Sequence, residues 1–232
     1  MDILQLTPAE LAAMRLSLRV SGWAVVLSLP FGILAAWVLS RLRFPGRRLL
    51  DGVIHLPLVL PPVVIGYLLL VTCGKNGAIG SFLHARFGLT LAFTWKGAVL
   101  AAAVMAFPLM VRAIRLSMDA VDRNVEAAAR TLGAGPIRVF FTITLPLALP
   151  GVITGTMLAF ARSLGEFGAT IMFVSNIPGQ TQTLPLALYT FTQVPGGENG
   201  AMRLCVIAVV IAMAALLCSD VLARRYAAKM DG

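Results

Sequence analysis

The stretch DAVDRNVEAAARTLGAGPIRVFFTITLP covers residues 119–146. Its first part is polar, and a long apolar segment lies on each side of this part. Asp122 is a residue type that often caps the N-terminus of a helix. Apolar residues recur after it on one helical face: Val125, Ala128, Ala129 and Leu132. Gly133 and Gly135 can end this helix, and Pro136 prevents its continuation. The stretch therefore predicts a short helix with a face of small residues. Such a face suits a groove on another protein, but the helix could equally rest on lipid headgroups.

Outward from this helix, the sequence contains five apolar stretches, each about as long as the 20 residues that a membrane-spanning helix needs. They cover residues 20–40, 53–73, 97–113, 147–174 and 204–222. We therefore expect an all-α integral membrane protein of five transmembrane helices, with the short helix between the third and the fourth. No polar segment reads as a separate unit, so residues 1–232 are predicted to form one transmembrane domain.

The composition supports this class. Hydrophobic residues make up 59% of the chain, charged residues only 12%, and the mean hydropathy is +0.88. A soluble domain is about a quarter charged and could not hide so much apolar surface in one core. These values exclude a soluble enzyme, a disordered chain and a nucleic-acid-binding domain. The net charge of +9 is interpreted as charge in cytoplasmic loops.

Lysine and arginine are distributed unequally between the two sides of the predicted bundle. Twelve of the 19 fall in the segments 41–48, 112–138 and 224–229, and six fall on the opposite side. Because basic residues favour the cytoplasmic side, this distribution predicts an external N-terminus and a cytoplasmic C-terminus. Arg15 and Arg19 argue locally for the reverse.

Helix-breaking and polar residues inside the spans are the candidates for a translocation path. Pro61 and Pro62 interrupt helical hydrogen bonding in the second span, which indicates either a kink or a broken helix that lines a path. Arg162 and Glu166 are spaced to share one helical face, either as a structural ion pair or as part of an anion route. Two neighbouring hydroxyls could donate hydrogen bonds to an oxyanion: Ser163 and Thr170.

The segment 119–146 also resembles a motif of the integral membrane subunits of ABC importers. That motif reads Glu-Ala-Ala, three residues, Gly, nine residues and Ile-x-Leu-Pro, and Gly133 is followed after nine residues by Ile-Thr-Leu-Pro. The glutamate departs from the pattern, because Glu126 lies one position before the place that the motif reserves for it. The resemblance implies a coupling helix that contacts a cytoplasmic ATPase subunit. Its contact residues would be Glu126, Ala127, Ala128, Ala129, Arg130, Thr131, Leu132 and Gly133.

The resemblance also implies a division of labour between polypeptides. The sequence contains no phosphate-binding loop of the form G-x-x-x-x-G-K-[S/T], so ATP hydrolysis is expected in another chain and this chain is not expected to be an enzyme. The implied complex lies in the bacterial inner membrane. It contains two copies of this chain, two ATPase subunits and an external oxyanion-binding protein. No cofactor, metal site or nucleic-acid partner is expected.

Nearly the whole chain resembles permease subunits of molybdate ABC importers. Five stretches carry this resemblance: LSLPFGILAAW (27–37), HLPLVLPPVVIGYLLL (55–70), FPLMVRAIRL (107–116), ARTLGAGPIRVFFTITLPLALPG (129–151) and FARSLGEFGATIMFVSNIPGQTQTLPLALYT (160–190). The resemblance implies import of molybdate. Sulfate, thiosulfate and tungstate remain alternative substrates. A secondary anion transporter is the alternative of a different class, but it would need coupling-ion sites and paired halves that the sequence does not display.

The predicted external stretch 175–200 is long and contains the apolar run LPLALYTF (184–191), which is too short to span a membrane. It is either an ordinary loop or a short helix. In the second case we expect it to form an external gate and part of the surface on which the binding protein docks.

Overall fold

The computed structural model of the chain describes residues 6–230, and every regular element within them is helical. Residues 1–5 and 231–232 of the predicted domain lie outside the described residues, as do the side chains of 219, 220 and 222–230. The elements are α1 (Pro8–Arg41), α2 (Arg47–Val59), α3 (Pro62–Cys73), α4 (Ala78–Phe87), α5 (Trp95–Ala120), α6 (Arg123–Thr131), α7 (Pro136–Val139), the π-helical turn η1 (Phe140–Thr144), α8 (Leu145–Leu147), α9 (Leu149–Leu164), α10 (Gly168–Val174), α11 (Leu184–Thr192) and α12 (Glu198–Met230).

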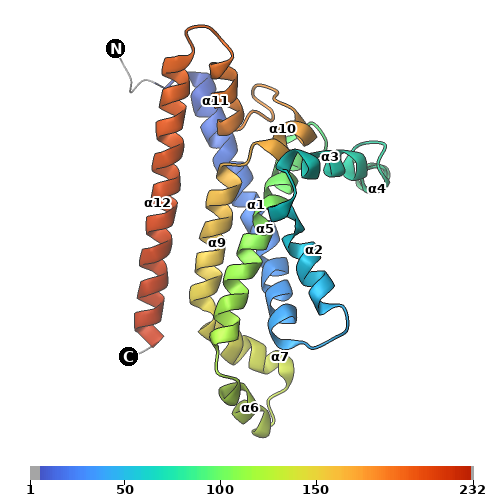
Figure 1. Cartoon of the computed structure of the whole chain (residues 1–232), viewed down its shortest axis with the longest axis vertical. Coiled ribbons are helices and arrows are strands. Elements are labelled where there is room, and N and C mark those ends of the chain that lie inside the picture. The colour runs from blue at the N-terminus through green and yellow to red at the C-terminus, as the bar shows by residue number, and fades with distance from the viewer. Residues whose placement is uncertain (1–5, 231–232) are drawn as a thin grey trace.

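Long apolar helices form the body of the molecule (Figure 1). Among the described residues, α1, α5 and the first 21 residues of α12 are each long and apolar enough to cross a membrane. Two bent pairs pass the same test together: α2 with α3, and the α7–α8 segment with α9. The all-α membrane fold is therefore confirmed, with five spans when each bent pair counts as one.

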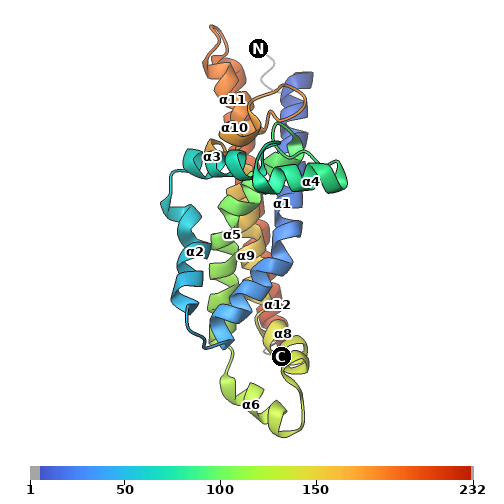
Figure 2. The same cartoon turned by 90° about the vertical axis from the view of Figure 1, so that its right-hand side faces the viewer.

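The helices α1, α5 and α9 lie side by side along the long axis, and α12 lies against α9 (Figure 1). Figure 2 shows α3 and α4 running across this axis toward one end, whereas α6 lies at the other end. The beginning of α1 and the end of α12 also lie at opposite ends, as an odd number of spans requires. The end of α12 lies toward the same end as α6, and the side of the membrane that this end faces stays a prediction.

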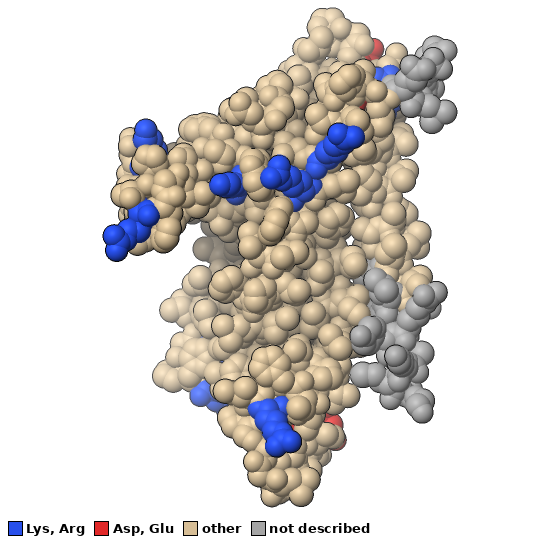
Figure 3. Space-filling model, turned by 180° about the vertical axis from the view of Figure 1, so that it is seen from behind, with Lys and Arg blue, Asp and Glu red and all other residues tan. Residues whose placement is uncertain are grey.

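Charged side chains avoid the middle of the bundle. Figure 3 shows lysine and arginine gathered at two levels, with a broad uncharged band between them on the visible face. Large apolar side chains are exposed along the spans, including Phe31, Val59 and Val210. Because a lipid bilayer solvates apolar side chains, this band is the surface expected of a membrane-embedded bundle.

Small residues allow the central helices to approach closely. Ala36, Ala101 and Ala159 are completely buried where α1, α5 and α9 meet. A Cβ atom on Gly151 would lie 2.1 Å from the Cβ of Ser117, so α9 crosses α5 at a distance that only glycine permits.

The first helix begins twelve residues before the predicted span at residue 20. Thr7 and Glu10 form a capping box, in which the Thr7 hydroxyl accepts from the Glu10 N–H at 3.3 Å and the Glu10 carboxylate accepts from the Thr7 N–H at 2.7 Å. Arg203 of α12 then pairs with buried Glu10 at 2.8 Å. Hydropathy locates the apolar part of α1, whereas caps and a long-range ion pair determine where the helix starts.

The second predicted span, 53–73, is two helices bent by 113°. Neither Pro61 nor Pro62 has a backbone N–H to donate, so the hydrogen-bonding ladder of α2 stops and α3 starts afresh at Pro62. Of the two alternatives left open by the sequence, the broken helix is the one found. The connection to the third span also contains α4, which the sequence analysis did not predict.

The fourth predicted span, 147–174, differs from the structure at both ends. The chain enters α9 through the α7–α8 segment, which is bent from α9 by 69°. Pro146 and Pro150 remove two donors at this bend. At the other end α9 stops at Leu164, and α10 forms separately after three residues outside a helix. Because the apolar composition continues across both breaks, hydropathy alone does not detect them.

Candidate functional site

Helix α6 has the bounds that the sequence predicts. Asp122 is its N-cap, and Oδ1 of that residue accepts the backbone N–H of Asn124 at 2.9 Å. The helix ends at Thr131, and Gly133 has a φ of +83°, a region that residues with side chains rarely enter. The predicted cap and the predicted stop are both confirmed.

The outer surface of α6 and of the turn after it is apolar. Leu132 is 88% exposed, Ile137 is 74% exposed, and Val125 is also exposed. Ala128 is exposed between them, whereas Ala129 is half-buried. Most of the predicted small-residue face therefore points away from the bundle. An apolar surface at the end of the molecule, beyond the uncharged band, is typical of contact with either another protein or a membrane surface.

Glu126 faces the opposite way, into the protein, and only 4% of it is exposed. Its Oε1 lies 2.9 Å from Nη2 of Arg41 and 3.0 Å from Nε of the same residue. The same oxygen accepts a hydrogen bond from the hydroxyl of Thr144 at 2.7 Å. Glu126 therefore attaches α6 to the end of α1 and to η1.

Arg41 extends this attachment to α5. Its guanidinium donates to the backbone carbonyl of Met118 at 2.7 Å and to Oγ of Ser40 at 3.0 Å. Ser40 in turn donates to the carboxylate of Asp119. We call the connected side chains the polar junction: Ser40, Arg41, Asp119, Glu126 and Thr144. The polar junction joins α1, α5, α6 and η1 in one hydrogen-bonded network.

The sequence predicts an external contact for Glu126 and does not indicate that Arg41 and Thr144 are its partners. The one-residue offset of Glu126 from the importer motif is the feature of the sequence that could have indicated its inward orientation. One residue corresponds to about 100° around a helix axis. The motif position itself, Ala127, is exposed, and Glu126 is turned toward the bundle.

The breaks in the second and fourth spans meet in space (Figure 1). A Cβ atom on Gly168, the first residue of α10, would lie 2.8 Å from the Cβ of Pro62. A Cβ atom on Gly66 of α3 would lie 2.6 Å from the carbonyl oxygen of Ala169. The backbones of α3 and α10 are therefore in direct contact beside Pro61 and Pro62. We call this contact the broken-span crossing.

Arg162 and Glu166 form an ion pair next to the broken-span crossing, with Nη1 and Oε2 2.6 Å apart. The Glu166 side chain is 2% exposed and that of Arg162 is 28% exposed. The other carboxylate oxygen of Glu166 accepts the backbone N–H of Ala169 at 2.9 Å, so this residue also caps α10. The predicted pair is present even though the helix that was to carry it ends at Leu164.

The two candidate hydroxyls are both buried. Ser163 is 4% exposed and its Oγ lies 3.5 Å from the carbonyl oxygen of Ala102, whereas Thr170 is 1% exposed on α10. The predicted path residues thus gather around the two helix breaks. Of the charged or hydroxyl-bearing side chains among them, Arg162 alone is partly accessible within the described part of the chain.

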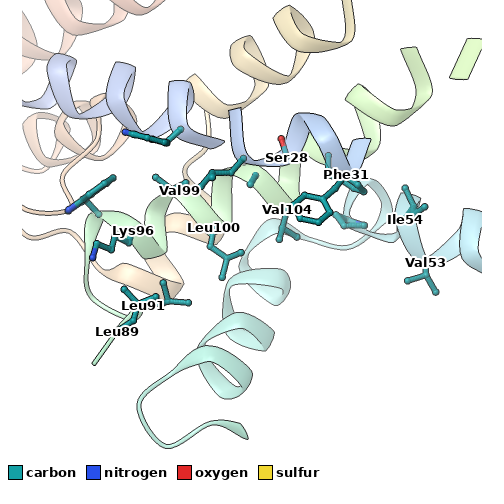
Figure 4. Close-up of a pocket in the computed structure, with 16 residues that line it drawn as sticks. Ser28, Phe31, Val53, Ile54, Leu89, Leu91, Lys96, Val99, Leu100 and Val104 are labelled. Carbon is teal, nitrogen blue, oxygen red and sulfur yellow. The ribbon is translucent and has the colours of Figure 1, made fainter. Parts of the chain in front are cut away.

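A cavity of about 780 Å³ opens between α1, α2 and α5 (Figure 4). Its labelled lining includes Phe31, Val53, Leu100 and Val104, and Lys96 lies at one end. Such a lining suits hydrocarbon. It does not suit a dianion, because it offers too few donors to replace the hydration shell of the ion.

The apolar run 184–191 forms the short helix α11 (Leu184–Thr192) and is not an ordinary loop, which was the other alternative. Its first residue, Leu184, donates its backbone N–H to Oγ of Ser17 in α1 at 2.6 Å. Leu186 and Ala187 are buried. The stretch is therefore packed on the bundle, and its role as a gate stays a prediction.

Among the side chains that the structure describes, no group of three His, Cys, Asp or Glu residues could hold a metal ion. His55 lies 3.3 Å from Asp51 of the same helix, α2. Cys73 is buried and free, and Cys205 and Cys218 are exposed and free.

Comparison with known proteins adds a family and a fold. Residues 28–232 match the family described as "Binding-protein-dependent transport system inner membrane component". The "Molybdenum transport system permease protein ModB" of Escherichia coli (strain K12) is 67% identical over 94% of this chain and 96% of that protein. The protein of the same description from Haemophilus influenzae is 59% identical over 95% and 96% of the two chains. The permease fold also matches a chain in a bacterial alginate ABC transporter in complex with an alginate-pentasaccharide-bound periplasmic protein. That match has a TM-score of 0.74 and 15% identity, and covers 94% of this chain and 80% of the other.

Proposed function

Because this chain belongs to the family of inner membrane components of binding-protein-dependent transport systems, we propose that it is the permease subunit of an ABC importer for molybdate. The observation that carries this proposal is the 67% identity with a molybdenum permease over nearly the full length of both chains. The resemblance of the span-four region to molybdate permeases supports the same substrate.

In this proposal, ATP is hydrolysed by two separate ATPase subunits, and α6 is the coupling helix that each copy of this chain inserts into one of them. The exposed residues Ala127, Ala128 and Leu132 support a contact through the outer face. The buried position of Glu126 supports a different role for this residue, as the internal anchor of the helix.

The polar junction offers a physical route from α6 to the spans. When the ATPase subunits close, α6 moves with them, and the buried ion pair between Arg41 and Glu126 moves the ends of α1 and α5. Leaving one partner of such a buried pair alone costs about 3 to 5 kcal/mol, so the pair is expected to stay formed while α6 moves. Both helices pack against α9, which leads to the broken-span crossing.

We further propose that two copies of this chain form the translocation path, with the broken-span crossing of each copy beside it. Arg162 provides a partly accessible positive charge for the anion. One such charge supports transient contact, so capture at low concentration falls to the external binding protein. The presence of a periplasmic protein in the structurally similar alginate transporter supports this partner.

The test is uptake into proteoliposomes that contain this chain, its ATPase and its binding protein. We expect ATP-dependent accumulation of molybdate that a large excess of sulfate does not suppress. Preferential uptake of sulfate or thiosulfate would replace the substrate and keep the importer. Uptake that needs neither ATP nor a partner would identify a secondary transporter and overturn the proposal. Parallel assays with tungstate measure how far the permease separates the two dianions.

A further inference from the structure

A second cavity, of about 600 Å³, lies where the loop after α1 enters α2. Four arginines and one aspartate line it: Arg43, Arg47, Arg48, Arg115 and Asp51. We call it the arginine pocket. The loop after α1 and the start of α2, which contribute most of its lining, lie toward the end of the bundle that carries α6 (Figure 1).

The arginine pocket has more positive charge than its own carboxylates can balance. Arg115 is neutralised, because its Nη1 lies 2.9 Å from Oδ1 of Asp51 and its Nε lies 3.6 Å from Oδ2 of Asp119. Arg47 donates only to a neutral group, the backbone carbonyl of Leu39. Within the described part of the chain, no carboxylate lies within ion-pair distance of the other arginines or of Arg47.

The backbone adds to this charge. The first turn of α2 forms one wall of the pocket, and Gly46 is its N-cap with a φ of +90°. No side chain caps this turn, and it contains no acidic residue. The positive end of the helix dipole therefore acts in the same direction as the guanidinium groups.

The surroundings of the arginine pocket are of the kind typical of the level of lipid headgroups. Three apolar side chains beside the arginines are exposed, with Leu49 at 73%, Leu42 at 41% and Phe44 at 37%. Apolar side chains next to arginines are typical of a segment at the boundary between hydrocarbon and water.

We propose that the arginine pocket binds a tetrahedral oxyanion group. The planar guanidinium groups of Arg43 and Arg48 can each donate two hydrogen bonds to oxygens of such a group, and the three unbalanced positive charges are enough to neutralise a phosphate monoanion or a free dianion. The same chemistry is present in the phosphate of an anionic lipid and in a free oxyanion in the cytoplasm. The proposal goes beyond the transport function, because the pocket is separate from the proposed path.

The experiment compares the complex that carries Arg43→Gln and Arg48→Gln with a matched control, Lys75→Gln and Arg86→Gln. The control removes the same charge from two exposed residues, one within α4 and one just before it, and α4 lies toward the end of the molecule away from α6 (Figure 2). In the first arm, complexes in nanodiscs of phosphatidylcholine with some phosphatidylglycerol are released and examined by native mass spectrometry for retained phosphatidylglycerol. In the second arm, equilibrium dialysis measures radiolabelled molybdate bound in phosphatidylcholine nanodiscs without binding protein.

We expect at least one arm to show binding that the arginine variant loses about tenfold or more, since the variant removes two charged hydrogen-bond donors. The control should bind like the unmodified complex. Loss in the first arm identifies lipid phosphate, and loss in the second identifies a free oxyanion. Equal binding by variant and control in both arms overturns the proposal, whatever the uptake assay shows. The single variants Arg43→Gln and Arg48→Gln give the same comparison if the double variant does not assemble.

Discussion

Glu126 lies one residue before the position that the importer motif reserves for glutamate, and this shift turns its side chain by about 100° around α6. The carboxylate consequently meets Arg41 and Thr144 inside the protein. The sequence reveals the offset but not its effect, because Arg41 is 85 residues away and its proximity depends on the packing of α1 against α5.

Replacing Glu126 with glutamine tests the polar junction. The change leaves the buried charge of Arg41 without its partner, and we expect it to destabilise the complex by about 3 kcal/mol. Uptake should fall more than ATP hydrolysis, because α6 then moves without the spans. Thermal unfolding, hydrolysis and uptake are measured on the same preparation. The control is Glu198→Gln, at an exposed glutamate, and equal behaviour of the two variants would contradict the role of Glu126.

Gly133 and Gly135 provide a matched pair at the end of α6. No atom lies within 4 Å of a Cβ built on either residue, but only Gly133 has a positive φ. Gly133→Leu should strain the backbone by about 1 to 2 kcal/mol and displace Leu132, so that hydrolysis continues while uptake is lost. Gly135→Leu should retain most uptake. If both variants transport normally, the proposed coupling contact is wrong.

Arg162 has two possible roles, as a structural partner of Glu166 and as part of the anion route, and substitutions of Arg162 distinguish them. Arg162→Gln leaves the buried carboxylate of Glu166 without its positively charged partner, so we expect a smaller yield of assembled complex and a lower melting temperature. Arg162→Lys keeps the charge and should restore assembly. An intact glutamine variant with slow uptake would instead assign Arg162 to the anion route alone.

At the scale of elements, the sequence predicts helix ends well where neighbouring residues determine them, and poorly where packing against distant helices determines them. The cap, the length and the end of α6 follow from Asp122 and Gly133. An interruption at Pro61 and Pro62 also follows from local chemistry, but the sequence leaves open whether it is a kink or the break that the structure shows. The break after Leu164 does not follow from local chemistry, because α10 is held in place by contact with α3. No sequence pattern near Leu164 indicates that α3 and α10 are in contact.

The broken-span crossing predicts a steric effect that depends on position. Gly66→Val would place a side chain against the backbone of α10, and overpacking of this kind costs about 1 to 3 kcal/mol. We expect slower uptake and a lower melting temperature. Gly165→Ala, at a position where a Cβ meets nothing within 4 Å, is the control. If the valine variant melts and transports as the control does, α3 and α10 are not in close contact in the working complex.

For the whole molecule, hydropathy predicts the number of spans and charge predicts their direction. The structure places α6 and the start of α12 at opposite ends, which agrees with this direction but does not identify the sides of the membrane (Figure 1). Helix bending and the arginine pocket appear only when the segments are assembled in three dimensions.

Cysteine labelling in intact cells tests the predicted orientation. In cells that express the chain without its ATPase, and in a background without Cys73, Cys205 and Cys218, Leu132→Cys should react with a membrane-impermeant maleimide only after the cells are opened. Glu198→Cys should react in intact cells, because the start of α12 is predicted to be external. The opposite pattern would reverse the orientation and exclude a cytoplasmic α6.

The pair between Arg41 and Glu126 also bears on how the chain is made. The ribosome completes α1 long before it synthesises α6, since the two residues are 85 positions apart. During that interval Arg41 has no carboxylate partner, and it stays hydrated at the membrane surface. Burial of the pair is therefore a late event that requires α1, α5 and η1 to be correctly inserted first. A chain in which α1 or α5 is inserted wrongly would leave both charges exposed, and this exposure would give cellular quality control a feature by which to recognise it.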